Sequence, residues 1–230
     1  MVITMQNNEC GRIYSKYFPF WDKLEPSDRM LLCDNSMRAE YTKGTNVHGE
    51  SGSCTGAIVV KSGCLRAYMM SEDGREITLY RLFPGDICML SASCVLKAIT
   101  FDVIIDAEED SVCYVIGGRV FSEVAERNVW TENFALEVAV GRFSDVMWVM
   151  QQILFMSFDR RLAIFLWDEM SKTGESTINM THEQIAKYMG SAREVVSRML
   201  KYFTTEGITE HSRGGITVLD KQRLRALAMG

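Results

Sequence analysis

Short apolar segments separated by turn-forming residues occupy the chain from about residue 40 to residue 117. The apolar segments are AIVV, LRAYMM, EITLYRLF, DVIIDA and SVCYVI, and the turns between them are KGT, KSG, SEDG, FPGD and AEED. Several strands at this spacing predict a β-sandwich or barrel. Asp73-Gly74 lies between two of the segments and predicts a tight hairpin with positive φ at both residues.

The period of the pattern changes to that of a helix after about residue 120. Helices are predicted over Val120–Arg127 and Thr131–Phe155, and Gly141 is the only glycine in these two segments. Within the longer helix, apolar residues step by four and three positions, as in a heptad repeat. They are Leu136, Val140, Phe143, Met147, Met150 and Leu154. We favour a homodimer interface for this seam, and the alternative is core within one chain, because flanking positions such as Trp148 and Ile153 are apolar too.

Two short helices joined at a glycine are predicted from Thr181 onward, in the segment MTHEQIAKYMGSAREVVSRML. Thr181 and Gln184 have the spacing of a capping box, and Gly190 can end the first helix in the left-handed conformation. Ser191 is predicted to cap the second helix, with Glu194 as its capping-box partner. Two strands around Arg213-Gly214-Gly215 and a final helix follow. A helix that starts at Ser157-Phe158-Asp159 precedes this segment, so we place the domain join near Phe155–Phe158.

The second of these helices carries polar residues on one face. Val195, Val196, Met199 and Leu200 point one way, whereas Arg193, Ser197 and Lys201 are spaced i, i+4, i+8, with Glu194 and Arg198 beside them. This is the geometry of the recognition helix in a helix-turn-helix, whose first turns enter the major groove. Arg can bond both acceptors of guanine, and Glu can accept from the amino group of cytosine. The alternative is that Glu194 only closes the capping box and pairs with Arg198 on the surface.

Composition and charge agree with a soluble protein of two domains. The chain has 230 residues, of which 47% are hydrophobic and 24% charged, and this suits a soluble protein with a sizeable core. No stretch is apolar enough to span a membrane, and no signal peptide is visible, so we expect a cytoplasmic protein. The segment from Thr177 onward carries eight Lys and Arg against five Asp and Glu, which leaves a net charge of −8 for the first 176 residues. A basic end on an acidic body suits binding to a polyanion.

Seven cysteines lie in the first half of the chain, at positions 10, 33, 54, 64, 88, 94 and 113. Their odd number and wide spacing predict no disulfide framework. His48 lies in a loop and is a weak candidate for a metal ligand, so we predict no metal site. No nucleophile–base pair, glycine-rich phosphate loop or zinc motif is visible, and the chain is therefore not expected to be an enzyme.

The segments GAIVVKSGCLRAYMMSEDGREITLYRLFPGD and MTHEQIAKYMGSAREVVSRMLKYFTTEGI, with the long helix between them, resemble the CRP/FNR superfamily of bacterial transcription regulators over about residues 15–225. The resemblance implies an α+β chain with three parts. These are a double-stranded β-helix (jelly-roll) sensor domain over residues 1–125, a dimerisation helix over 126–156 and a winged helix-turn-helix over 157–230. In the family, the residues equivalent to Arg193, Glu194 and Arg198 contact each half of a palindrome, and Ser197 matches the FNR-like branch. The expected DNA-contacting set is Thr181, His182, Ser191, Arg193, Glu194, Ser197, Arg198, Lys201 and Arg213.

The sensor segment departs from the pattern of the cyclic-nucleotide binders in this family. Those members carry a Gly-Glu segment and then an Arg-Ser/Thr-Ala segment that hold the cyclic phosphate. After Pro84-Gly85-Asp86 this chain reads ICMLSASCVLKAITFDVIIDAEED, with neither feature. Cyclic AMP is therefore not the expected effector, because no guanidinium is available for the phosphate. The candidate effector-binding residues are Cys88, Ser91, Ser93, Cys94 and Lys97.

The sequence leaves the nature of the signal open. The FNR-type iron–sulfur cluster is not expected, because the N-terminus offers only Cys10 and Cys33. Cys54, Cys64, Cys88 and Cys94 could sense redox state or bind haem iron, and the alternative is that they are small buried hydrophobic residues. The leading hypothesis is a homodimeric regulator that binds double-stranded DNA under control of a small-molecule effector. The second is a haem- or thiol-based redox sensor. The cofactor is unknown, RNA polymerase is an expected partner if the protein is an activator, and no membrane partner is expected.

Overall fold

The computed structural model describes residues 2–4, 7–49, 55–89, 91, 103–212 and 215–230. These residues form two compact units. The first comprises Met1–Met69 and Leu79–Val146, and the second comprises Met70–Thr78 and Met147–Gly230.

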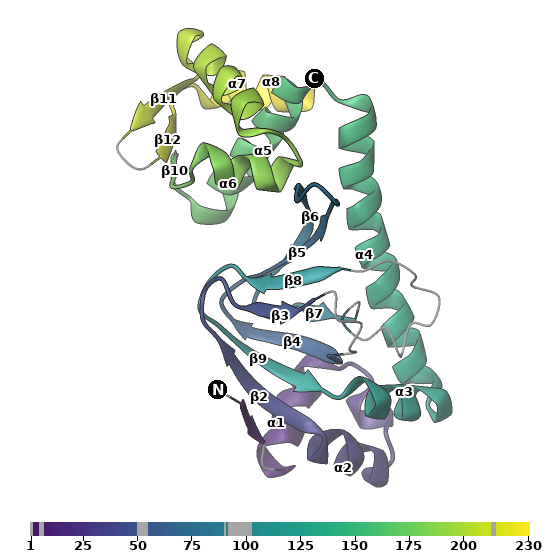
Figure 1. Cartoon of the computed structure of the whole chain (residues 1–230). Coiled ribbons are helices and arrows are strands. Elements are labelled where there is room, and N and C mark those ends of the chain that lie inside the picture. The colour runs from purple at the N-terminus through teal and green to yellow at the C-terminus, as the bar shows by residue number, and fades with distance from the viewer. Residues whose placement is uncertain (1, 5–6, 50–54, 90, 92–102, 213–214) are drawn as a thin grey trace. The chain divides into compact units, whose positions relative to one another are not determined.

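Two β-sheets form the centre of the first unit (Figure 1). The strands, in chain order, are β1 Val2–Thr4, β2 Ser36–Tyr41, β3 Asn46–His48, β4 Ala57–Ser62, β5 Leu65–Met70, β6 Glu76–Leu82, β7 Ile87–Cys88, β8 Ile104–Ala107 and β9 Ser111–Ile116. One sheet has the order β1-β2-β9-β4-β7, and the other has the order β3-β8-β5-β6. All five apolar segments that were predicted as strands are strands, so the predicted β-domain is confirmed.

The turn between β5 and β6 differs from the prediction. Gly74 has φ +78°, but no residue other than glycine has a positive φ among the described residues, so Asp73 does not adopt the conformation expected of a two-residue turn. The loop is longer, because Ser71 N–H donates to the carbonyl of Arg75 at 2.9 Å and β6 begins only at Glu76. The side chain of Asp73 instead accepts hydrogen bonds from Ser71 Oγ at 2.6 Å and from Arg75 Nε at 2.7 Å.

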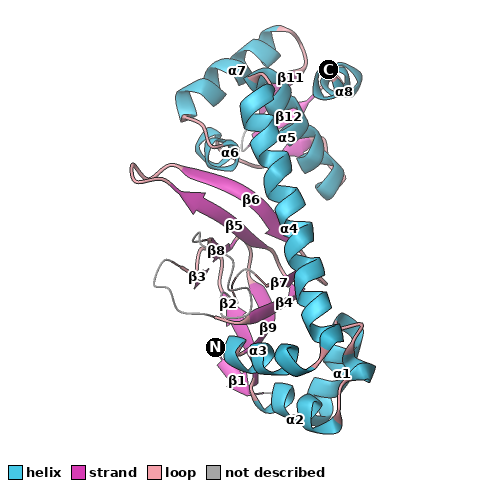
Figure 2. Ribbon diagram, turned by 90° about the vertical axis from the view of Figure 1, so that its right-hand side faces the viewer, coloured by secondary structure: helices cyan, strands magenta, loops and turns pink. Residues whose placement is uncertain are grey.

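Three α-helices and one short 3₁₀-helix gather at one end of these sheets (Figures 1 and 2). They are α1 Asn7–Tyr17, η1 Trp21–Lys23, α2 Pro26–Asp34 and α3 Gly118–Arg127. Aromatic rings fill the space between them: the Phe18 ring stacks on Tyr14 and on Phe20, each at 5.1 Å between centroids. Asp28, buried on α2, accepts from Arg127 at the end of α3, at 2.7 Å. This cluster fixes the helices that lead into the long helix.

A disulfide joins α1 to α2, contrary to the prediction from the cysteine count. Cys10 and Cys33 are bonded, their Cα atoms are 5.6 Å apart, and both are buried. A separation of 23 residues in sequence carries no pairing signal, whereas the packing of α1 on α2 brings the two Cα atoms to a bridging distance. Cys64, Cys88 and Cys113, the other cysteines that the structure describes, are free thiols.

The long predicted helix is present as α4, Val129–Phe155. Its 27 residues span about 40 Å at 1.5 Å per residue. Phe134, Val138, Ala139 and Val146 pack against the core of the first unit. The six residues of the heptad seam are all exposed, Phe143 at 64% and Leu154 at 60%. α4 thus has one face on the β-domain and one apolar face that no described residue covers.

The second unit contains the helices and strands that follow α4, together with the tip of the β5–β6 hairpin. They are α5 Phe158–Thr173, β10 Thr177–Ile178, α6 His182–Met189, α7 Arg193–Thr205, β11 Thr209–Ser212, β12 Gly215–Val218 and α8 Lys221–Met229. The three strands form a sheet in the order β10-β12-β11. α4 ends at Phe155 and α5 begins at Phe158, as predicted. The two compact units divide between Val146 and Met147, and the domain join near Phe155–Phe158 stays a prediction. Within the described residues, no helix combines the length and the apolar character that a membrane span requires.

Candidate nucleic-acid interface and sensor domain

The first helix of the pair, α6, begins with the predicted capping box. Thr181 Oγ1 accepts from the Gln184 N–H at 3.2 Å, and Gln184 Oε1 accepts from the Thr181 N–H at 2.8 Å. The helix ends at Gly190, which has φ +60°, and Ile185, Ala186 and Met189 are buried as predicted. Arg161 of α5 donates to the carbonyl of Met189 at 2.5 Å, and this bond satisfies a free carbonyl at the end of α6. The left-handed Gly190 and the Arg161 hydrogen bond therefore both stabilise the end of α6, from which the turn leads into α7.

The start of α7 corrects the second capping prediction. The N-cap is Ala192 rather than Ser191, and no side chain caps the helix. Glu194 is consequently the second residue of the helix, and its carboxylate closes no capping box. The helix dipole favours a carboxylate in the first turn, and here the carboxylate makes no capping hydrogen bond. The alternative explanation of Glu194 as a capping residue is therefore wrong.

One face of α7 is buried and the other carries unpaired charge. Val196, Leu200 and Phe203 are fully buried in the core of the unit, as the apolar spacing predicts. The exposed charged side chains of α7 are Arg193, Glu194, Arg198 and Lys201. Among the described residues, none of these four side chains makes a hydrogen bond or an ion pair, and no ion pair joins Glu194 to Arg198. The alternative of a surface pair is thus not realised, and the four charged groups have no hydrogen-bond or ion-pair partner in the described part of the chain.

Ser197 and His182 belong to a contact that sequence analysis missed. His182 Nδ1 is hydrogen-bonded to Ser197 Oγ at 2.7 Å, and the His182 ring lies 5.3 Å from the ring of His211 on β11. Burial, then the charges of His211 and Arg193, lower the pKa of His182, so its neutral form is favoured at pH 7. The imidazole connects α6, α7 and the strand that begins the wing. Ser197 and His211 lie 15 and 29 residues after His182, and contacts at such separations leave no periodic pattern in a sequence.

The two wing strands pair antiparallel, with His211 opposite Ile216. Arg213, predicted to contact DNA, lies outside the described residues. Thr181 is the N-cap of α6, and Ser191 lies in the turn between Gly190 and Ala192, the N-cap of α7. The predicted DNA-contacting residues that the structure describes therefore belong to one helix pair and the turn between its helices. This arrangement is a winged helix-turn-helix.

Residues 160–227 match the family model for a Crp-like helix-turn-helix domain, and residues 38–128 match the model for a cyclic nucleotide-binding domain. A crystal structure of a Crp/Fnr family protein from Eubacterium rectale ATCC 33656 is 44% identical in sequence, with a TM-score of 0.89. The match covers 93% of this chain and 99% of that one. This chain belongs to the CRP/FNR family.

Two curated relatives in the CRP/FNR family are similar along most of their length. The nitrogen fixation regulation protein FixK of Bradyrhizobium diazoefficiens is 26% identical over 198 residues, which are 83% of this chain and 81% of FixK. The transcriptional activator protein FnrA of Stutzerimonas stutzeri is 27% identical over 200 residues, 82% of this chain and 79% of FnrA. These relatives are transcription regulators and not enzymes. The chain is a DNA-binding transcription regulator with a sensor domain.

The CRP/FNR sensor domain places two of the predicted effector residues in the core. Cys88 and Ser91 are both fully buried, and Ser91 Oγ donates to the carbonyl of Gly56 at 2.6 Å. The hydroxyl of Ser91 thus satisfies a backbone group rather than facing an open cavity. Ser93, Cys94 and Lys97 lie outside the described residues, as does Cys54.

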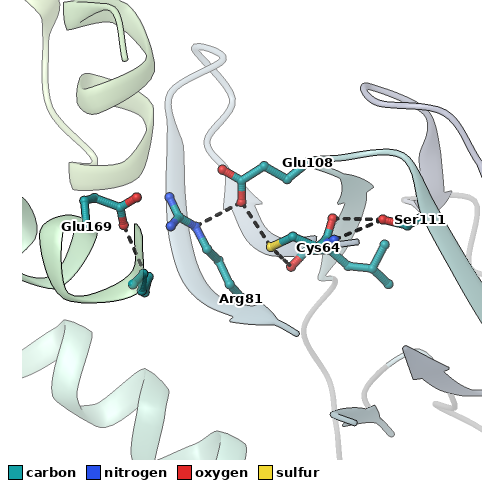
Figure 3. Close-up of polar contacts among 7 residues, drawn as sticks. Cys64, Arg81, Glu108, Ser111 and Glu169 are labelled. Carbon is teal, nitrogen blue, oxygen red and sulfur yellow. Dashed lines mark hydrogen bonds and ion pairs between the residues drawn. The ribbon is translucent and has the colours of Figure 1, made fainter. Parts of the chain in front are cut away.

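The environment of the other cysteines bears on the redox alternative. Figure 3 shows Cys64 beside Glu108, whose carboxylate pairs with Arg81 Nε at 3.0 Å and accepts from the Cys64 thiol at 3.5 Å. Burial and the neighbouring Glu108 raise the pKa of Cys64 to about 12, and burial raises the pKa of Cys113 to about 12. A thiol with such a pKa stays protonated at neutral pH, and the protonated thiol is a poor nucleophile and metal ligand.

Metal-binding side chains do not converge in the described part of the chain, where no three His, Cys, Asp or Glu residues form a cluster. His48, predicted to lie in a loop, is instead the last residue of β3, and its Nδ1 is hydrogen-bonded to Thr55 Oγ1 at 2.8 Å.

Proposed function

We propose that this CRP/FNR protein acts as a homodimer that binds a palindromic operator through α7 and that a small effector in the β-domain controls its affinity. The observation that carries the proposal is the exposed, unpaired charge at the start of α7: Arg193, Glu194, Arg198 and Lys201. Groups of this kind can contact DNA without an intramolecular hydrogen bond or ion pair being broken first. The N-terminal turns of a recognition helix are also the part that contacts base edges.

Dimerisation is proposed from the uncovered apolar seam of α4. Soluble monomers rarely expose a contiguous apolar stripe of this length, and such a patch marks an interface. Leu136, Val140 and Phe143 lie in the first unit, and Met147, Met150 and Leu154 in the second, so the seam runs along most of the helix. Two chains related by a twofold axis would bury this stripe against itself. A twofold protein matches a twofold operator.

The effector is proposed to be a small molecule rather than a redox signal. The pKa values of Cys64 and Cys113 argue against thiolate chemistry at those two residues, and the redox alternative then rests on the Cys10–Cys33 disulfide and on Cys54, Cys88 and Cys94. If the protein activates transcription, RNA polymerase is a further partner. The proposed domain boundaries remain residues 1–125, 126–156 and 157–230.

Binding to a duplex with TGA-like palindromic half-sites is the direct test of the proposal. Fluorescence anisotropy should show tighter binding to the palindrome than to a scrambled duplex of the same length. Affinity for both duplexes should fall steeply between about 50 mM and 200 mM salt, because cationic side chains release counterions from the phosphates. Equal affinity for the two duplexes, or no dependence on salt, would contradict the proposal.

Cyclic AMP is expected not to bind to the β-domain. The cyclic phosphate of a nucleotide needs a buried guanidinium or equivalent, and the only basic residue between Arg81 and Arg119 is Lys97. Isothermal titration calorimetry of the full-length protein with cyclic AMP should give no measurable heat beyond dilution. A site with a dissociation constant of about 10 μM or lower, corresponding to about −7 kcal/mol, would overturn this expectation.

A further inference from the structure

A groove of about 470 Å³ lies between α4 and the β-domain, and no site residue predicted from the sequence lines it. One wall is the turn and strand at Gly85–Ile87, and the other is the segment of α4 from Phe134 to Asp145. Tyr17, at the end of α1, closes one side. All of these residues belong to the first unit. The volume is within the range of small-molecule sites.

Gly141 forms part of the groove wall in the interior of a 27-residue helix. Glycine is among the least favourable residues in a helix interior, and here neither its backbone conformation nor close packing requires it. Its φ is not positive, and a Cβ at this position would meet no atom within 4 Å. Any larger side chain at this position would project into open space beside the groove residues Phe134, Val138 and Asp145. The missing side chain therefore keeps the groove open.

The groove is apolar at its sides and negative at one end. Phe134, Val138 and Tyr17 supply rings and an aliphatic surface. Arg142 is shared by two carboxylates, Asp145 at 3.0 Å and Asp86 at 3.6 Å, so three charged groups leave a net charge of −1. The guanidinium also lies over the Tyr80 ring at 4.9 Å, and its side chain is only 17% exposed. The two carboxylates, in contrast, are 39% and 44% exposed and keep acceptor positions open.

We infer that this groove binds an organic ammonium ion whose apolar or aromatic body lies against Phe134 and Tyr17 and whose charge lies beside the exposed oxygens of Asp86 and Asp145, which Arg142 leaves with a net charge of −1. A monocation neutralises the end of the groove, whereas an anion would have to displace the carboxylates from Arg142. Ammonium groups are further stabilised at the faces of aromatic rings. The inference rests on the proposed effector control for its regulatory meaning, because it gives the chemical class of ligand that the sensor domain takes.

The groove remains open in the proposed dimer. Successive residues of an α-helix are rotated by 100° about its axis. Each of three groove residues precedes a seam residue by two positions: Phe134 precedes Leu136, Val138 precedes Val140, and Asp145 precedes Met147. Two positions correspond to a rotation of about 200° about the helix axis. The two sets lie on opposite sides of α4, so a ligand in the groove and a partner chain on the seam do not compete. A ligand between the β-domain and this helix would contact both parts of the sensor at once.

The test uses saturation-transfer NMR on the full-length protein without DNA, with three probes that share a 2-phenylethyl group and differ in the charge of the polar end. These are 2-phenylethylammonium, 2-phenylethanol and 3-phenylpropionate. We expect the ammonium probe to bind best and the carboxylate probe to bind about three- to tenfold more weakly. The carboxylate probe cannot form the exposed ion pair with Asp86 and Asp145, and it is repelled by the same two side chains. Absence of ammonium binding, or preference for the carboxylate, overturns the inference.

Gly141→Trp should abolish binding of the ammonium probe by filling the groove, while its thermal unfolding temperature stays at or above that of the wild type. Unchanged probe binding in this variant overturns the inference. Asp145→Asn keeps the shape of the groove and should weaken the ammonium probe about three- to fivefold. The matched control Glu137→Gln removes the same charge from an exposed position of α4 that does not line the groove, and should bind the probe as the wild type does.

If Asp145→Asn and Glu137→Gln weakened binding of the ammonium probe equally, the negative charge of the whole chain would explain the binding, not a specific site. That result also overturns the inference. This pair decides the matter even if Gly141→Trp does not fold. Because probe binding is measured on the free protein, its failure leaves the DNA-binding test of the proposed function untouched.

Discussion

The double variant Phe143→Asp, Met150→Asp is expected to sediment as a monomer at concentrations where the wild type is a dimer. In a twofold interface each substitution appears twice, so four carboxylates would be buried in the seam without partners. Burying an unpaired charge in an apolar contact costs several kcal/mol. A total of at least about 4 kcal/mol corresponds to a thousandfold increase in the dissociation constant of the dimer. Sedimentation velocity at low micromolar concentration measures the change.

The matched control for this experiment is Ser144→Asp, Gln151→Asp. It adds the same two charges with the same spacing, each one position after a seam residue and on an exposed part of α4. Such flanking positions commonly carry charge in paired helices. The control should remain dimeric. A dimeric Phe143→Asp, Met150→Asp variant would show that the seam is not the interface, and dissociation of both variants would show that added charge alone, not the seam, explains the result.

Arg198→Ala should remove most of the sequence preference of DNA binding. Arg198 is exposed one turn after Glu194 and pairs with no other described residue, so its guanidinium is available to reach the O6 and N7 atoms of a guanine. Loss of a bidentate base contact costs about 1–3 kcal/mol per half-site. A dimer makes the contact twice, so affinity for a palindrome with TGA-like half-sites should fall by about 2–6 kcal/mol. Binding to a scrambled duplex should change little.

Lys201→Ala is the comparison that separates base recognition from general attraction. Lys201 is also exposed and unpaired, but it lies further along α7, where a phosphate contact is expected. This variant should weaken binding to all duplexes alike and reduce the salt dependence by about one unit of slope. Gel shifts with specific and scrambled duplexes at two salt concentrations distinguish the variants. If Arg198→Ala costs the specific complex no more than Lys201→Ala does, Arg198 does not contact bases.

Local signals predicted the fold well where the residues that make an element are neighbours in sequence. The capping box of Thr181 and Gln184 and the left-handed Gly190 were predicted because both depend on residues within one turn. The strands β4, β5, β6, β8 and β9 followed from short apolar segments between turns. The uncovered seam of α4 followed from heptad spacing alone, since nothing else in the sequence was needed to place those side chains on one face.

The failures concern choices between adjacent residues and contacts between distant ones. Ser191 and Ala192 were both available as the N-cap of α7, and the backbone that leaves the Gly190 turn selects Ala192, against side-chain preference. Asp73-Gly74 has the composition of a two-residue turn, but the hydrogen bonds of Ser71 and Arg75 favour a longer loop. The Cys10–Cys33 bond, the contact of His182 with Ser197 and the groove beside Gly141 all bring together residues far apart in the chain. No pattern of hydrophobic and polar positions contains that information.

The contact of His182 with both Ser197 and His211 changes what counts as the specificity-determining unit of this regulator. If only the exposed residues of α7 were replaced, the imidazole of His182 would remain hydrogen-bonded to Ser197 in the middle of that helix. Replacing Ser197 would release the ring, and the ring is also a neighbour of the wing. Grafting a new specificity therefore requires α6, α7 and β11 to be exchanged together, as one cassette.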